Sequence, residues 1–309
     1  MNKLLIVGTV AFDAIETPFG KTDKILGGAA TYIGLSASNF NNVDSAIVSV
    51  IGEDFPQDYI EMLEAKKINL AGLETVKGGK TFFWSGKYHN DMNSRDTLET
   101  QLNVLENFNP VVPDAYKDAD VVMLGNLHPL VQLGVIEQMT KKPKLVVLDT
   151  MNFWMDCALE ELKRVIAKVD VITINDEEAR QLSGEYSLVK AARVISEMGP
   201  KYVVIKKGEH GALLFDKDNV FFAPALPLEE VFDPTGAGDT FAGGFSGYLA
   251  STADFSFENM KKAIVHGSNL ASFCVEKFGT ERMENLSKSE VAKRLLQFKA
   301  LTQFEIELH

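Results

Sequence analysis

Cysteine is scarce in this sequence, with only Cys157 and Cys274 among 309 residues. There is no CxxC pair, and neither the cysteines nor the histidines stand at the spacing of a zinc site. These absences exclude a disulfide-stapled fold and a Cys-rich zinc domain. Such low cysteine usage fits a protein of a reducing compartment.

Long apolar runs and an excess of positive charge are lacking as well. No run approaches the roughly 20 apolar residues of a membrane span, and the first run, 4–7, is shorter than the roughly 7–15 residues of a signal-peptide core. The chain has 31 basic and 43 acidic residues, a net charge of −12, which disfavours nonspecific binding to phosphate backbones. We therefore expect a cytoplasmic protein that binds neither membrane nor nucleic acid.

What the chain does contain is an ordinary globular composition, with 46% hydrophobic and 24% charged residues. By length alone, one large or two ordinary domains would fit. No internal repeat, low-complexity tract or Pro/Ser-rich linker divides the chain. We therefore expect a single main domain over residues 1–309.

Short apolar runs alternate with longer helical patterns along most of the chain. The runs that predict strands are 3–7, 46–50, 121–124, 145–148, 171–174 and 202–205, and helical patterns occupy 56–67, 130–140, 159–168 and 187–198. Continuous apolar runs are typical of strands that are covered on both faces, and strand–helix alternation produces parallel sheets. The sequence therefore predicts an α/β fold with a central, mostly parallel sheet and a largely helical C-terminal third.

Two segments depart from this alternation and predict a small β lid, formed by about residues 12–18 and 80–102. The first is an extended run where a helix would be expected after the first strand. The second predicts two antiparallel strands, of which the first carries Phe82, Trp84 and Tyr88 on one face by its period of two. Such an aromatic face covers a ligand or a second subunit; the alternative is a plain surface hairpin.

The sharpest motif is the run DPTGAGDTFAGG at residues 233–244, which opens a helical pattern. Glycine at a helix start allows close approach of the backbone, and the free amides of Gly236, Ala237 and Gly238 can bind an anion with help from the helix dipole. Asp239 follows them and could accept a proton. Anion-binding amides beside a carboxylate suit phosphoryl transfer to a hydroxyl; a glycine-rich turn with a helix cap is the alternative.

This run resembles the C-terminal signature of the ribokinase-like, or PfkB, carbohydrate kinases. Further segments are similar to family motifs in the family's order along nearly the whole chain. They are Gly8 with Asp13, the pair Gly27 and Gly28, the segment 52–54, the segment 149–152, Asn175 with Glu178, and the segment 206–211. Each is weak by itself, and Asn175 with Glu178 would alone be a helix capping box; their joint order carries the resemblance.

The resemblance implies a three-layer αβα fold with a β lid over the substrate, and transfer of the ATP γ-phosphate to a hydroxyl of a sugar or sugar derivative. It implies Asp239 as catalytic base and residues 236–238 as anion hole. The implied acceptor-binding residues are Asp13, Gly27, Gly28 and, where the family often has asparagine, Tyr32.

For the nucleotide side, the resemblance implies Asn175, Glu178, Lys206 and Gly208. Glu178 would organise Mg²⁺ through water, and Asp233 would be a ligand of the monovalent cation, such as K⁺, that many members use. The lid implies a homodimer, with Trp84 at or near its buried face.

Departures from the family pattern keep alternatives open. Tyr32 replaces an amide, Lys206 replaces a threonine, and Phe153 and Trp154 stand where an arginine is usual. Tyr32 and the lid aromatics could stack on a base, so a nucleoside kinase is the alternative enzyme. A sensor without catalysis is a third reading, which the presence of Asp239 disfavours. Residues 78–81 imitate the end of a P-loop, but a strand pattern follows where a helix is required.

Overall fold

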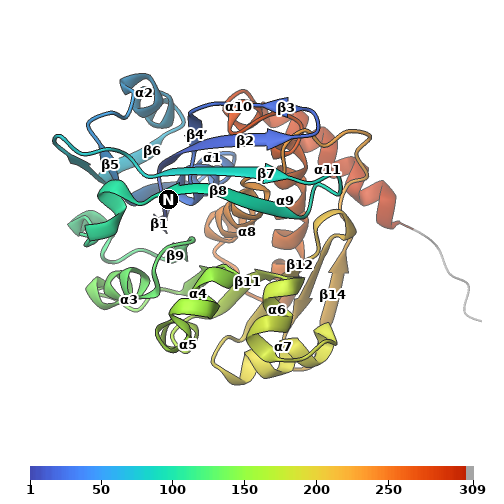
Figure 1. The fold of residues 1–309 in the computed structure, drawn as a ribbon. Coiled ribbons are helices and arrows are strands. Elements are labelled where there is room, and N and C mark those ends of the chain that lie inside the picture. The colour runs from blue at the N-terminus through green and yellow to red at the C-terminus, as the bar shows by residue number, and fades with distance from the viewer. Residues whose placement is uncertain (304–309) are drawn as a thin grey trace, which may run out of the picture.

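The computed structural model describes residues 1–303, and within them a nine-stranded sheet forms the centre of the molecule (Figure 1). In their order across the sheet, the strands are β14 (Val220–Ala223), β13 (Ala212–Phe215), β12 (Tyr202–Lys206), β11 (Val171–Asn175), β10 (Leu145–Asp149), β9 (Val121–Leu124), β1 (Asn2–Val7), β5 (Val43–Gly52) and β6 (Ile68–Val76). Neighbouring strands are parallel except in the pairs β12–β13 and β13–β14, which are antiparallel. The predicted mostly parallel sheet is confirmed.

Helices cover both faces of this sheet. They are α1 (Ala29–Ala37), α2 (Gln57–Ala65), α3 (Pro129–Gln138), α4 (Asn152–Cys157), α5 (Leu159–Ile166), α6 (Asp176–Ser183), α7 (Leu188–Glu197), α8 (Ala237–Thr252), α9 (Phe257–Cys274), α10 (Glu281–Glu284) and α11 (Lys288–Thr302). In the part of the chain that the structure describes, no helix has the length and apolar character that crossing a membrane requires.

Two hydrophobic cores lie on opposite sides of the sheet, as strand β1 shows. Its side chains alternate between them: Leu4 and Ile6 pack with α1, α8 and α9, whereas Leu5 and Val7 pack with α3, α5 and α7. All four are fully buried. A strand with both faces covered needs no polar side, and this is why its sequence is continuously apolar. The architecture is therefore the expected three-layer αβα sandwich.

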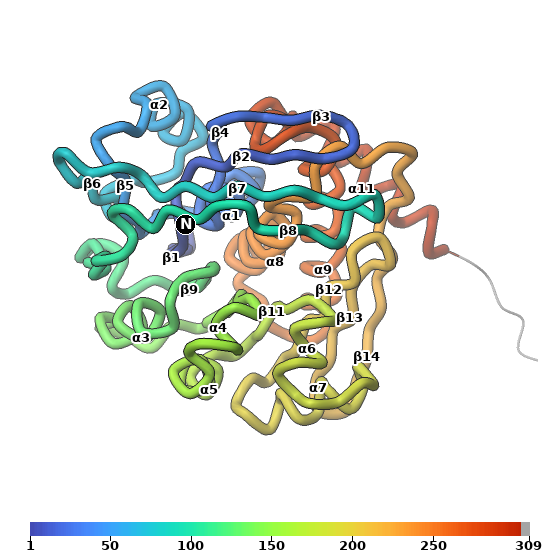
Figure 2. Tube along the Cα trace, viewed as in Figure 1, coloured from blue at the N-terminus to red at the C-terminus, as the bar shows by residue number. Residues whose placement is uncertain are grey.

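A second, smaller sheet lies over one edge of the core and corresponds to the expected lid. It consists of β3 (Gly20–Lys21), β2 (Ala11–Thr17), β7 (Phe83–Tyr88) and β8 (Arg95–Gln101), with β4 (Ile25–Gly27) paired to β2. Strand β2 pairs in parallel with β7, and β7 pairs antiparallel with β8. Figure 2 shows β2, β7 and β8 running together across the molecule, away from the helices α5 and α7.

The register of the lid decides which side chains face the core. Asp13 pairs with Trp84, and because paired residues share a face, Trp84 and Tyr88 lie on the same face as Asp13. We call this the inner face of the lid. Phe82, expected to extend that aromatic row, precedes β7, and its carbonyl accepts the N–H of Phe12 at 2.9 Å. The register therefore argues against Trp84 as a residue of an outer dimer seam.

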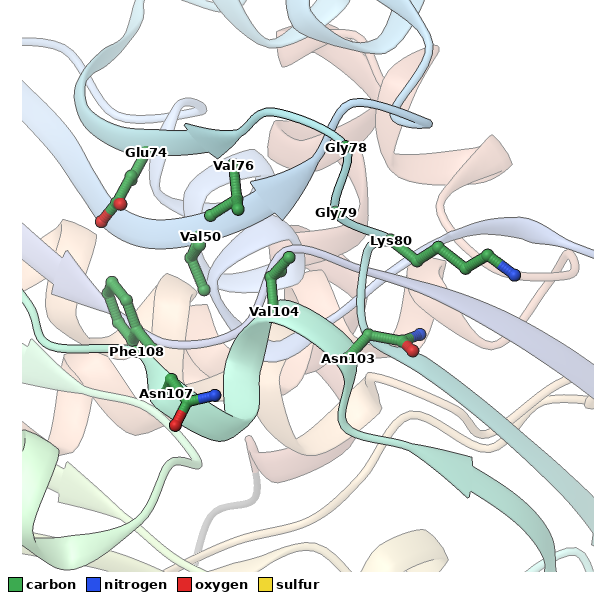
Figure 3. A pocket seen from close by; sticks show the side chains of 10 residues that line it. All are labelled: Val50, Glu74, Val76, Gly78, Gly79, Lys80, Asn103, Val104, Asn107 and Phe108. Carbon is green, nitrogen blue, oxygen red and sulfur yellow. The ribbon is translucent and has the colours of Figure 1, made fainter.

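A hollow of about 530 Å³ lies beside the start of the lid hairpin, between the end of β6 and the 3₁₀ helix Asn103–Asn107 (Figure 3). Residues 78–80 line one side of it, and the Lys80 side chain extends away from Asn107 and Phe108. The chain then enters strand β7 rather than a helix. The rejection of a P-loop at residues 78–81 is therefore confirmed.

Candidate active site

Three neighbouring strands bring polar side chains together at one edge of the sheet. Strands β10, β11 and β12 end at Asp149, Asn175 and Lys206. The Lys206 Nζ lies 2.5 Å from the Asp149 Oδ2, and the hydroxyl of Thr173 donates to the same oxygen at 2.8 Å. Asp149 thus holds the lysine ammonium over the carboxyl ends of the strands, which is where ligands bind in open α/β sheets.

Asn175 and Glu178 form the capping box that begins helix α6. The Asn175 Oδ1 accepts the Glu178 N–H, and the Glu178 Oε2 accepts the Asn175 N–H, both at 2.8 Å. Glu178 is 8% exposed. Burial raises its pKa to about 7, although the Lys206 charge opposes that rise. One carboxylate oxygen is therefore used by the helix cap, and the other remains for a ligand.

The glycine-rich run 233–244 opens helix α8 as expected, with Gly236 as N-cap in the left-handed region, at φ 74°. The Ala237 N–H donates to the Pro234 carbonyl at 3.2 Å, so Ala237 does not offer a free amide to an anion, contrary to the sequence-based expectation. Among residues 1–303, the N–H groups of Gly236 and Gly238 have no acceptor. These two amides therefore remain for a ligand at the helix N-terminus.

Lys206 reaches the same helix N-terminus from the sheet. A Cβ atom added to Gly238 would lie 3.2 Å from the Lys206 Nζ, so this glycine leaves room for the ammonium. Asp239 lies in the first turn of α8. Burial raises the pKa of Asp239 to about 7, and repulsion from Asp149 adds to the rise, whereas Lys206 and Arg95 oppose it.

Asp13 lies on the inner face of the lid against the loop of Gly27 and Gly28. A Cβ atom at Gly27 would lie 1.9 Å from the Asp13 Oδ2, and one at Gly28, whose φ is +92°, would lie 2.5 Å from the Thr9 carbonyl oxygen. Both positions therefore need glycine. Asp13 is 5% exposed, and its burial, followed by repulsion from Asp233 and Asp239, raises its pKa to about 7.

Tyr32, on helix α1, is packed beneath the start of α8. A Cβ atom at Gly236 would lie 2.4 Å from the Tyr32 ring, which is 1% exposed. The covered ring has no free face on which a base could stack. Its hydroxyl is buried without a hydrogen-bond partner among the described residues, so the oxygen, rather than the ring, is the group that Tyr32 can offer to a ligand.

Two further contacts close the site. The Thr235 hydroxyl donates to the Tyr88 hydroxyl oxygen at 3.2 Å and so joins the lid to the loop before α8. The two carboxylate oxygens of the fully buried Asp233 accept the backbone N–H groups of Thr235 and Gly279, each at 2.8 Å. Burial raises the Asp233 pKa, while these hydrogen bonds oppose the rise.

Metal-binding capacity within residues 1–303 is limited, because no group of three or more His, Cys, Asp or Glu side chains there could hold an ion. Mg²⁺ bound through substrate phosphates and water needs only one or two protein carboxylates. The half-free carboxylate of Glu178 fits that mode.

The structure adds residues that sequence reasoning missed. Asp149 fell within a recognised motif, but its bond to Lys206 depends on two strands that are far apart in the sequence. Arg95 lies in none of the sequence motifs. Its position opposite Tyr88 follows from the register of the hairpin, which could not be predicted from the sequence.

Known proteins resemble this chain over most of its length. A family model described as pfkB family carbohydrate kinase matches residues 1–286. A cytidine kinase of Thermococcus kodakarensis is 31% identical over 255 residues, covering 80% of this chain and 89% of that protein. A nucleoside kinase of Methanothermobacter thermautotrophicus is 28% identical over 299 residues, covering 90% and 91%.

Solved structures share the fold. The nucleoside kinase of Methanocaldococcus jannaschii, described as an archaeal member of the ribokinase family, aligns with a TM-score of 0.76 at 22% identity, covering 96% of this chain and 99% of that one. A ribokinase of Thermotoga maritima aligns with a TM-score of 0.75 at 20% identity, covering 96% and 100%.

Proposed function

Because the chain belongs to the pfkB family of carbohydrate kinases, phosphotransferases that act on hydroxyl groups of sugars or nucleosides with ATP as co-substrate, we propose that its acceptor is a nucleoside. The observation that carries this choice is the pairing of Asp13 with Trp84 on the inner face of the lid. A carboxylate binds ribose hydroxyls. The Trp84 indole lies over Gly86 with Arg95 5.9 Å from its ring centre, and its remaining apolar surface would stack on a base. The names of the cytidine and nucleoside kinase relatives agree with it.

On the acceptor side, Asp13 would accept hydrogen bonds from two hydroxyls of the sugar ring. Asp239 would take the proton of the attacking hydroxyl as its bond to phosphorus forms, a general-base role that does not require a strongly basic group. The free amides of Gly236 and Gly238, at the positive end of α8, would stabilise charge on the phosphoryl oxygens.

On the nucleotide side, Lys206 would bind the transferred phosphoryl group, since its ammonium stands at the N-terminus of α8. Asn175 and Gly208 lie at the adjacent ends of β11 and β12 and would border the phosphates. Glu178 would hold Mg²⁺ through water, and the ion would supply charge neutralisation at the phosphates. With ATP as donor, we expect the reaction to take place in the cytoplasm.

A monovalent cation near Asp233 is part of the proposal. Asp233 fixes the loop before α8 through the Thr235 and Gly279 amides, and a bound K⁺ there would aim the free amides at the phosphoryl group. We expect higher turnover in potassium than in sodium or a large organic cation at fixed ionic strength. Equal rates in all three salts would remove the cation from the mechanism.

An ADP-release screen tests the acceptor class with nucleosides, free pentoses and hexoses, sugar phosphates and sugar acids. We expect nucleosides to give a kcat/KM at least about tenfold above free ribose. Trp84→Leu should raise the KM for nucleosides and leave that for free ribose within about twofold. A preference for free sugars would refute the nucleoside proposal and support the sugar kinase alternative. ATP binding without turnover of any acceptor would support the sensor.

A further inference from the structure

Arg95 begins strand β8 and pairs directly with Tyr88 across the lid hairpin. Directly opposite residues project to the same face of a sheet. The Tyr88 side chain is buried against the core and meets the Thr235 hydroxyl immediately before Gly236. Arg95 therefore projects from the inner face of the lid, toward the side on which α8 begins.

The tip of the hairpin, beyond Arg95, lies against the loop that follows β12. A Cβ atom at Gly208 would lie 2.9 Å from the Asn93 Oδ1, and the φ of Gly208 is +54°. Hydrogen bonds stabilise the turn itself, because the Asp91 Oδ1 accepts the N–H groups of Asn93 and Ser94 at 3.0 and 2.9 Å. The hairpin thus spans from the loop before α8 to the loop after β12, with Arg95 between them.

The charge of Arg95 has no counterion in residues 1–303, where the guanidinium makes neither an ion pair nor a hydrogen bond. Its neighbour there is the Trp84 indole, whose ring centre lies 5.9 Å from the Arg95 Cζ. Lys87 on the same hairpin is different, because its Nζ lies 2.6 Å from the Glu16 Oε1 on the outer face. The Arg95 charge lowers the pKa of both Asp239 and Glu178. Arg95 is also exposed to solvent, so this guanidinium without a counterion stands where an anion can reach it.

We propose that Arg95 is a catalytic residue that the lid carries to the phosphoryl group during transfer, opposite Lys206. The acceptor oxygen forms a bond to the γ-phosphorus, the bond to the β,γ-bridging oxygen breaks, ADP leaves, and the acceptor proton passes to Asp239. Arg95 donates two hydrogen bonds to the oxygens of the transferring group. The guanidinium fork matches these oxygens in a way that an ammonium does not. This role rests on the kinase reaction and not on the nucleoside preference.

Three variants test the role with the best acceptor found in the screen. We expect Arg95→Met to lower kcat by at least about 100-fold, the size typical for losing a donor to a developing oxyanion, with the KM for ATP changed less than about threefold. Arg95→Lys should recover part of the loss. The matched control is Lys87→Met, which removes a cation from the opposite face of the same hairpin and should leave kcat within about threefold.

A pH profile separates catalysis from a structural role. Because Arg95 lowers the pKa of Asp239, the acidic limb of kcat/KM should move to higher pH in Arg95→Met and stay near the wild-type position in Arg95→Lys and Lys87→Met. Equal thermal melting of the variants shows that the fold is intact. Turnover of Arg95→Met within threefold of wild type would overturn the proposal. So would an effect confined to the acceptor KM, because Arg95 would then bind the acceptor only.

Discussion

Three carboxyl groups at the site, Asp13, Glu178 and Asp239, are buried deeply enough that their pKa values rise to about 7. A buried acid with a raised pKa favours the folded state most when it is protonated. Its contribution is therefore fully present below the unfolded-state pKa, near 4, and is lost as the pH rises through about 7. The groups proposed for catalysis thus lower the stability of the protein at neutral pH.

Replacing Asp239 by asparagine should lower turnover and raise stability at neutral and alkaline pH. We expect Asp239→Asn to lower turnover by at least about 100-fold, the lower range of general-base effects, with ATP binding near normal. The same variant should melt roughly 2–4 °C higher than wild type at pH 8, if it regains about 1 kcal/mol, and show little difference at pH 4.5. Turnover of a tenth of wild type, with chemistry rate-limiting, would contradict the assignment.

Replacing Asp13 by alanine should affect the acceptor first. Its carboxylate can accept two hydroxyl hydrogen bonds, each worth about 1.5–3 kcal/mol when charge-assisted. The acceptor KM should therefore rise by well over tenfold, while the KM for ATP stays within a few-fold in the same assay. Equal effects on both substrates would remove Asp13 from the acceptor site.

At the scale of elements, the strands of the central sheet were predictable because burial on both faces leaves continuous apolar runs. Among the elements that escaped prediction, two did so for opposite physical reasons. Strand β6 is only partly buried, so it has no continuous run, and every residue of α1 is buried, so its sequence has no polar face to reveal a helical period. The lid hairpin was predicted, but not the register shift between Ser85 and Gly86 that brings Arg95 opposite Tyr88.

The loop between β4 and α1 offers a matched test of the acceptor site. Gly27→Ala would place a methyl group 1.9 Å from the Asp13 Oδ2, so the carboxylate must move and the acceptor KM should rise at least about tenfold. Gly134→Ala is the control, because its Cβ meets nothing within 4 Å in helix α3. It should leave kinetics unchanged and stabilise the protein by about 0.5–1 kcal/mol. Unchanged acceptor KM in Gly27→Ala would show that Asp13 binds no substrate.

At the scale of the whole molecule, we propose a homodimer through the edge of the lid. Every residue of β8 is exposed, including Leu98 at 56%, and an unpaired strand edge is a template for pairing with another chain. Leu98→Glu should shift a wild-type dimer to monomer in sedimentation at micromolar concentration. Leu296→Glu on α11, where the leucine is 67% exposed, is the control and should not. A monomeric wild type would refute the dimer.

The hairpin of the lid contacts the loop before α8, on the proposed acceptor side, through Tyr88 and Thr235. It lies against the loop after β12, on the proposed nucleotide side, through Asn93 and Gly208. Because one hairpin rests on both loops, the substrate that binds first and orders the hairpin also orders it for the second substrate. Linkage then requires reciprocity: whatever factor the acceptor adds to ATP affinity, ATP must add to acceptor affinity. The two substrates of this kinase should therefore bind with positive cooperativity within one chain, and neither affinity measured alone would describe the working enzyme.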